Sequence, residues 1–138
     1  MFSNILIAVD GSESASKAFR RSVYLAQKCN SKLDLVHAVQ CEVGGDSANT
    51  FEMIEELKDK AKKILEEYRI EAVKNNVPIQ ITIMQGDPAK VIIELAKAKS
   101  YDLIIMGTRG RSSFQELLIG SVSQKVIHHA SCPVMVVR

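Results

Sequence analysis

A glycine- and serine-rich stretch from Met106 to Ser123 holds the residue types in this chain that are best suited to binding a ligand. It follows a short apolar run that is typical of a buried strand, and it leads into apolar residues at helical spacing. Glycines between a strand and a helix let backbone N–H groups approach an anion closely, and the positive end of the helix favours negative charge there. The sequence therefore predicts a phosphate-binding site in this stretch.

The spacing of the glycines narrows the class of site. Gly107, Gly110 and the pair Gly120-Ser121 form the pattern G-x2-G-x9-G-S. No glycine in the chain is followed by Lys-Ser or Lys-Thr, and the fingerprint G-x-G-x-x-G does not occur, so neither a Walker A loop nor a dinucleotide fingerprint is present. A structural glycine turn whose serines only cap a helix is the alternative. The paired spacing favours a nucleotide.

Asp10 is a second candidate, because it follows the apolar run Asn4 to Val9 and precedes Gly11. A carboxylate at the end of a buried strand can bind a ligand, or it can accept a hydrogen bond from the backbone two residues on and so orient Gly11. The two roles are compatible.

No recognisable catalytic group emerges from the remaining polar residues. His37, the pair His128-His129 and Glu116 have no partner visible in the sequence. We expect His37 to be a buried, hydrogen-bonded strand residue, and the histidine pair to lie near the end of a helix, where positive charge is favourable. No nucleophile, base and orienting group can be assembled, so no catalytic residue is predicted.

Strands and helices are expected to alternate along the chain. Apolar runs predict strands over 4–9, 33–39, 79–84 and 103–106 and one from Pro133 onward, and amphipathic spacing predicts helices over 13–29, 50–75 and 120–130 and one after Asp87-Pro88. The strict alternation over 79–84 is typical of an edge strand with one buried face. This order predicts an α/β fold with a mostly parallel sheet and helices on both faces. Such doubly wound sheets bind ligands at the carboxyl ends of their strands.

Composition limits the partners that we expect. A chain of 138 residues is expected to form one domain. The net charge of +2, the dispersed basic residues and the lack of Trp argue against a nucleic-acid partner. The three cysteines show no zinc spacing, and neither a cationic leader nor a long apolar run appears. We therefore expect a cytoplasmic protein without a membrane partner.

The glycine pattern resembles the nucleotide-binding signature of the universal stress protein family, in its ATP-binding branch. Three further segments carry the resemblance along nearly the whole chain: the opening Ile5 to Ser12, the middle Leu35 to Ala38 and the closing Cys132 to Val137. The resemblance implies one nucleotide-binding domain over residues 1–138. It also implies a five-stranded sheet of order 3-2-1-4-5, which would bring Asp10 and the Gly107 loop to one crevice.

The family's ligand would be ATP or AMP, with Mg or Mn accompanying the triphosphate. Asp10 would accept bonds from the ribose hydroxyls or act on the metal through water, and no side chain is expected to ligate the metal directly. Ala8 and Ala38 would line the adenine slot with Met106 and Val122 nearby, although ordinary core residues would look the same. Arg109 could offset phosphate charge or be an idle loop residue. The expected site residues are Ala8, Asp10, Ala38, Met106, Gly107, Arg109, Gly110, Gly120, Ser121, Val122 and Ser123.

By this resemblance the chain is expected to act as a dimeric, stress- or energy-responsive regulator that holds an adenine nucleotide with little or no rapid hydrolysis. A slow ATPase or a nucleotidyl- or phosphoryl-transfer enzyme is one alternative, and an interaction module that needs no nucleotide is another. The apolar strand over 134–137 would be a bare sheet edge, so we expect it to pair with its copy in a homodimer.

Overall fold

A single α/β domain is seen in the computed structural model, which describes residues 1–40, 47–108 and 119–138. Within these residues, five parallel strands form one sheet in the order β3-β2-β1-β4-β5, which confirms the expected fold and strand order. The strands are β1 (Asn4–Ala8), β2 (Lys32–Val39), β3 (Ile79–Gln85), β4 (Leu103–Gly107) and β5 (Val134–Val137). The helices are α1 (Glu13–Cys29), α2 (Ser47–Lys74), α3 (Pro88–Ala98) and α4 (Ser121–His129).

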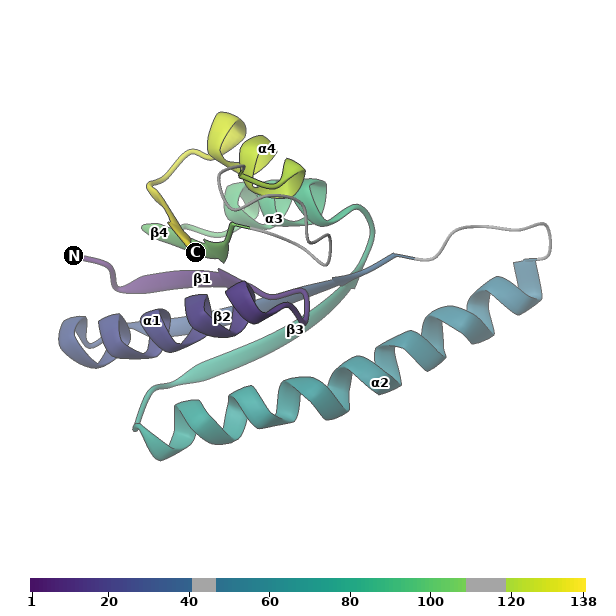
Figure 1. Ribbon diagram of the computed structural model, residues 1–138, viewed down its shortest axis with the longest axis horizontal. Helices are drawn as coiled ribbons and strands as arrows, with labels where there is room; N and C mark the ends of the chain where they lie inside the picture. The colour runs from purple at the N-terminus through teal and green to yellow at the C-terminus, as the bar shows by residue number, and fades with distance from the viewer. Residues whose placement is uncertain (41–46, 109–118) are drawn as a thin grey trace.

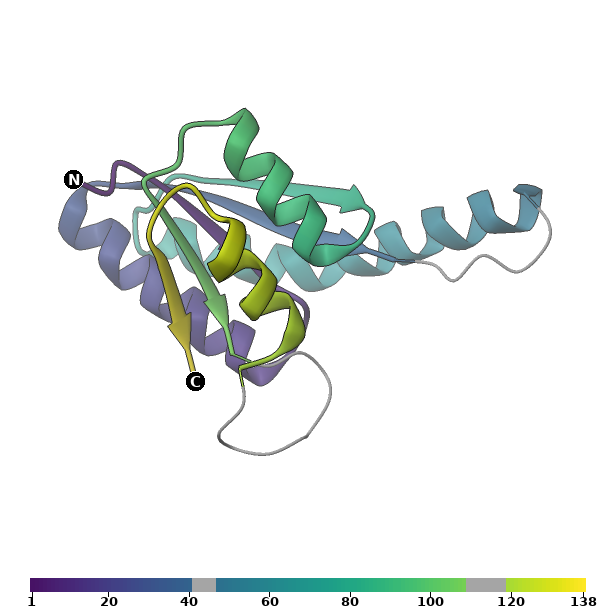
Figure 2. The same ribbon diagram turned by 90° about the horizontal axis from the view of Figure 1, so that it is seen from above.

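Helices cover both faces of the sheet. Figure 1 shows α1 and α2 on one face and α3 and α4 on the other, and Figure 2 shows the same layers from above. Side chains of a strand alternate between the faces, so Ile5 and Ile7 of β1 pack with Phe19 of α1, while Leu6 packs with Val126 of α4. A strand buried on both faces needs a continuous run of apolar residues, and the sequence of β1 after Asn4 is such a run.

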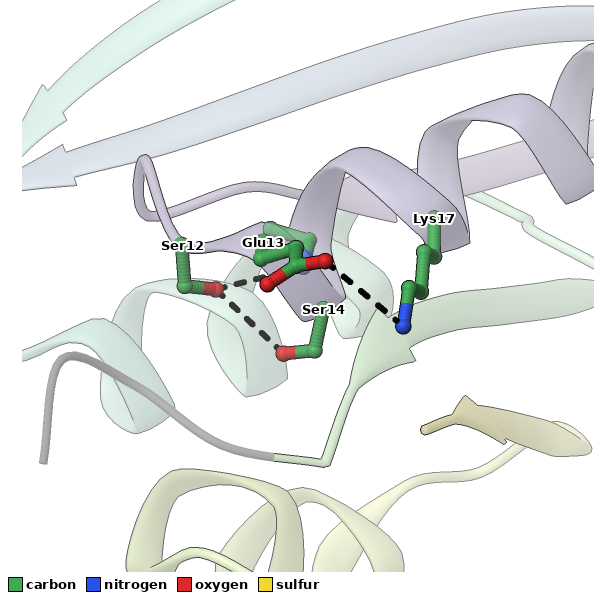
Figure 3. Close-up of polar contacts among 5 residues, drawn as sticks. Ser12, Glu13, Ser14 and Lys17 are labelled. Carbon is green, nitrogen blue, oxygen red and sulfur yellow. Dashed lines mark hydrogen bonds and ion pairs between the residues drawn. The ribbon is translucent and has the colours of Figure 1, made fainter. Parts of the chain in front are cut away.

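Helix ends follow the local sequence signals. The side chain of Ser12 accepts the N–H of Ala15 at 3.2 Å and caps the start of α1 (Figure 3). Asp87 caps α3 in the same way, as its sequence predicts. At the carboxyl end of α1, the cap residue Asn30 has the left-handed conformation, with φ 54°. Helix α2 begins at Ser47, earlier than the expected range. None of the helices in the described ranges is long and apolar enough to cross a membrane.

Asp102 joins the amino ends of β1 and β4. Its carboxylate accepts the N–H groups of Ser3 and Asn4, each at 2.9 Å. Desolvation opposes ionisation of this carboxyl, but the hydrogen bonds from Asn4 and Ser3, the backbone of Asp102 itself and the charge of the N-terminus together lower the pKa of Asp102 below its usual value. The central strands are thus held in register at the end of the sheet opposite to the glycine stretch.

Candidate functional site

The central strands β1 and β4 define where a ligand can bind. At their carboxyl ends the chain leaves β1 for α1 on one face and leaves β4 for α4 on the other, so the connections diverge at this point. A cavity of about 180 Å³ opens between them. A buried water needs only about 10–15 Å³ on a comparable measure, so the cavity has room for a molecule of several heavy atoms.

The wall of the cavity divides into an apolar part and a polar part. The apolar part is formed by Ala8, Val9, Ala15, Val36, Ala38, Pro88, Ile92, Met106 and Val122. The polar part is formed by Asp10, Gly107, Gly120, Ser121 and Ser123. A lining of this kind suits a ligand with an apolar body and a charged end.

The first turn of α4 supplies donors for that charged end. Gly120 is the N-cap residue, with φ −62° and ψ 161°, and no side-chain hydrogen bond caps the helix. The N–H of Gly120 donates to the carbonyl of Thr108 at 2.6 Å. Among the described residues, nothing accepts the N–H groups of Ser121, Val122 and Ser123. Three amides at the positive end of a helix dipole form a ready site for an anion.

The side chain of Ser123 has a different role from the one expected. Ser123 is buried, with 3% of its surface exposed. Its hydroxyl donates a hydrogen bond to the carbonyl of Gly107 at 2.8 Å. The hydroxyl proton is therefore used inside the protein, joining α4 to the end of β4, and is not directed at a ligand. Ser123 can still offer its backbone N–H, and the exposed Ser121 can offer both of its groups.

Gly107 is required by packing as well as by the cavity. A Cβ atom on this residue would lie 2.8 Å from the carbonyl carbon of Ser14 and 2.9 Å from the nitrogen of Ala15. Both atoms belong to the backbone of the first turn of α1, which cannot move aside as a side-chain end could. The lack of a side chain thus lets β4 approach α1, a reason that the phosphate-site interpretation did not contain.

Asp10 forms the turn that its position predicts. Its Oδ1 accepts the N–H of Ser12 at 2.9 Å across Gly11, whose φ of 85° lies in the region that favours glycine. No described residue bonds to Oδ2, and the half-buried carboxylate lines the cavity. The second oxygen is therefore available to a ligand hydroxyl or to water.

The histidines are not part of the lining of this cavity, although His37 lines an adjoining pocket that shares Asp10 and Ala38 with it. His37 on β2 donates from Nδ1 to the carbonyl of Val9 at 2.8 Å, so the expectation of a hydrogen-bonded strand residue is confirmed, although the side chain is half-buried and not fully buried. His128 and His129 are exposed in the last turn of α4. The described residues that line the cavity include no histidine.

All of the predicted site residues that the structure describes line this one cavity, while Arg109 and Gly110 lie outside the described residues. Five lining residues were missed by sequence reasoning: Val9, Ala15, Val36, Pro88 and Ile92. The strand order could have located Val36, because it pairs with Ala8 in the sheet. Pro88 and Ile92 follow from the packing of α3 over the ends of the strands, which no local pattern encodes.

Comparison with known proteins identifies the family to which this chain is similar. The family model described as "Universal stress protein family" matches residues 1–138. Universal stress protein YxiE of Bacillus subtilis (strain 168) is 34% identical over 148 residues, covering 100% of both chains.

Solved structures show the same fold. Universal stress protein UspA from Lactobacillus plantarum superposes with a TM-score of 0.91 at 27% identity, covering 99% of this chain and 98% of that one. A protein of the same family from Arabidopsis thaliana, described with AMP bound, superposes with a TM-score of 0.74 at 24% identity over 98% of this chain and 90% of that one. At that identity the likeness speaks for the fold alone.

Proposed function

This chain belongs to the universal stress protein family, and we propose that residues 1–138 form one domain that binds an adenine nucleotide, ATP or AMP. The observation that carries the proposal is the set of three amides at the start of α4 that no described residue accepts; they belong to residues that line the same cavity as Asp10. The Arabidopsis structure has AMP bound by its description, but the proposal rests on the cavity of this chain.

The two parts of the cavity support a proposed position for each part of the nucleotide. The phosphates would accept hydrogen bonds from the first-turn amides of α4, the ribose would lie at Asp10, and the base would lie against Ala8, Ala38 and Met106. Hydrogen bonds to a charged group contribute about 1.5–3 kcal/mol each, so three amides supply a large part of the roughly 8 kcal/mol of micromolar affinity. Mg or Mn would accompany the triphosphate, with Asp10 acting on the metal through water.

We propose that the nucleotide is held as a signal, without rapid hydrolysis, by a cytoplasmic regulator. Of the described residues that line the cavity, Asp10 alone is charged. Rapid phosphoryl transfer uses a lysine on the phosphates, acidic metal ligands and a group that positions water. Slow hydrolysis is the second candidate, and the available Oδ2 of Asp10 is the observation that favours it.

Calorimetric titration with MgATP at near-physiological salt is expected to show saturable binding. Absence of binding at millimolar nucleotide would exclude the proposed function. Asp10→Asn keeps a carbonyl acceptor for the N–H of Ser12 and removes the charge, so it is expected to weaken MgATP by about tenfold while AMP changes less. Phosphate release measured on the same variant separates the candidates: a residual rate that falls sharply supports an enzyme, and an unchanged rate counts against one.

The outer strand β5 is proposed to form a homodimer. Val134–Val137 are apolar and half-buried, and in the sheet of described strands β5 pairs with β4 alone. A second copy about a two-fold axis would cover this edge. Sedimentation at micromolar concentration is expected to give twice the chain mass of 15.3 kDa, and a monomer mass would contradict the dimer.

A further inference from the structure

The strand β3 forms the other edge of the sheet, and its own residues carry none of the usual protection. In the described sheet its only neighbour is β2. Its sequence, Ile-Gln-Ile-Thr-Ile-Met-Gln, contains no charged residue, proline or glycine. Edge strands are normally protected from pairing with other chains by charge, proline, bulges or short length. Ile79–Gln85 is thus a long strand whose free edge is open to pairing.

The backbone bonds at the two ends of β3 identify the groups on this edge. The carbonyl of Pro78 accepts from β2 at 2.9 Å, and the N–H of Gly86 donates to β2 at 3.0 Å. Successive residues of a strand direct their N–H and C=O groups to opposite sides. Even-numbered residues therefore bond to β2, and Ile79, Ile81 and Ile83 direct their backbone groups outward.

Helix α2 packs on one face of the sheet next to β3 (Figure 2), and its side chains give this edge a mostly basic border. Figure 1 shows α2 running along β3. A groove of about 470 Å³ between them is lined by Lys58, Lys62, Glu66 and Arg69, which share one face of α2. Three cations and one anion thus border the groove.

In the part of the chain that the structure describes, these cations form only partly exposed ion pairs within α2, so they remain available to an acidic ligand. Lys58, Lys62 and Arg69 each lie 3.4–3.9 Å from an acidic residue one turn earlier on α2. The side chains of these pairs are 31–70% exposed, and such surface pairs contribute little and exchange readily. The floor of the groove is apolar, formed by Leu65, Ile81 and Ile83.

We propose that the free edge of β3 binds an extended acidic segment of another protein as an additional strand. The backbone of that segment would pair with Ile79, Ile81 and Ile83, as in β-strand addition. Every second side chain of the added strand would lie beneath α2, where acidic residues meet the cations and apolar residues meet the floor. A second copy of this chain fits less well, because β3 has no acidic residue and two basic borders would repel each other.

The charge requirement is tested with a fluorescein-labelled peptide of alternating Glu and Val, followed by anisotropy. We expect saturable binding that weakens with salt, and no binding of a Lys and Val peptide. Lys62→Glu is expected to weaken binding about fivefold. Lys63→Glu is the matched control, since Lys63 is the exposed neighbour outside the groove and, like Lys62, lies four residues before a glutamate. Equal loss in both variants, or no binding to the wild type, would overturn the proposal.

The backbone requirement is tested with Ile81→Pro. Proline at this position removes an outward N–H and leaves the bonds to β2 intact, so the variant is expected to unfold cooperatively but to lose at least tenfold in peptide affinity. Hydrogen exchange should show the amides of Ile79, Ile81 and Ile83 protected when the acidic peptide is added. Binding without that protection, or self-association of the chain through β3, would contradict the added strand.

Discussion

Ser121→Pro is expected to weaken nucleotide binding by about 10- to 150-fold, the equivalent of one hydrogen bond of about 1.5–3 kcal/mol to a charged group. Proline is accepted at the first position of a helix, where its missing N–H has no partner within the helix. Gly120 already has an extended backbone, with φ −62° and ψ 161°, which is the conformation that a following proline imposes. The substitution therefore removes an amide from the site and leaves α4 intact.

Ser121→Ala is the control for the hydroxyl of the same residue. It keeps the amide, so its loss of affinity is expected to stay below about tenfold. Both variants are titrated with MgATP, and the difference between their affinities gives the contribution of the backbone amide. Thermal unfolding should show that both variants remain folded. If the Ser121→Pro variant bound MgATP as tightly as the wild type, the start of α4 would not hold the phosphates.

The helices and strands can be predicted from local sequence patterns, but the order in which the strands lie in the sheet cannot. The apolar run before Asp10 predicts a strand buried on both faces, and Asp87-Pro88 predicts the start of a helix. That β1 lies beside β4 is a contact between segments almost a hundred residues apart in the sequence. Periodicity cannot order strands, so this prediction came from the resemblance to a family.

Strand β3 shows where a correct pattern led to an incomplete expectation. Its alternation predicts an edge strand with one wet face, and the edge position is confirmed. Ile81 does face the core beneath α1 and α2, but Met84 on the opposite face packs against the core beneath α3 and α4. Helices on that face cover part of what the alternation alone assigns to water.

Within the site, residue types were easier to predict than their contacts. The glycine spacing identified Gly107, with Ser123 in the predicted helix turn that follows it, and both line the cavity. It did not reveal that the hydroxyl of Ser123 donates to the carbonyl of Gly107. Nor did it reveal that Gly107 abuts α1, because a contact between residues that far apart in the chain appears only when the layers are assembled.

Gly107→Ala is expected to lower the free energy of unfolding by about 1–3 kcal/mol, the usual cost of forcing extra atoms into a packed interior. The added Cβ would lie 2.8 Å from the carbonyl carbon of Ser14 and 2.9 Å from the nitrogen of Ala15. Without this contact, replacing glycine by alanine would stabilise the chain by about 0.4–1 kcal/mol through the unfolded state. The sign of the change in urea denaturation, measured without nucleotide, therefore decides whether the contact matters.

A second substitution separates the side chain of Ser14 from its backbone. A Cβ on residue 107 would also clash with the hydroxyl oxygen of Ser14. If that hydroxyl were the only obstacle, Ser14→Ala combined with Gly107→Ala would restore the wild-type stability. Because backbone atoms of α1 are also too close, the double variant is expected to remain destabilised. Nucleotide affinity should fall in the single and the double variant alike, since a displaced α1 carries with it Ser12, whose N–H fixes the carboxylate of Asp10. Full recovery of stability in the double variant would show that the backbone of α1 can yield, and that glycine at this position serves the ligand and not the packing.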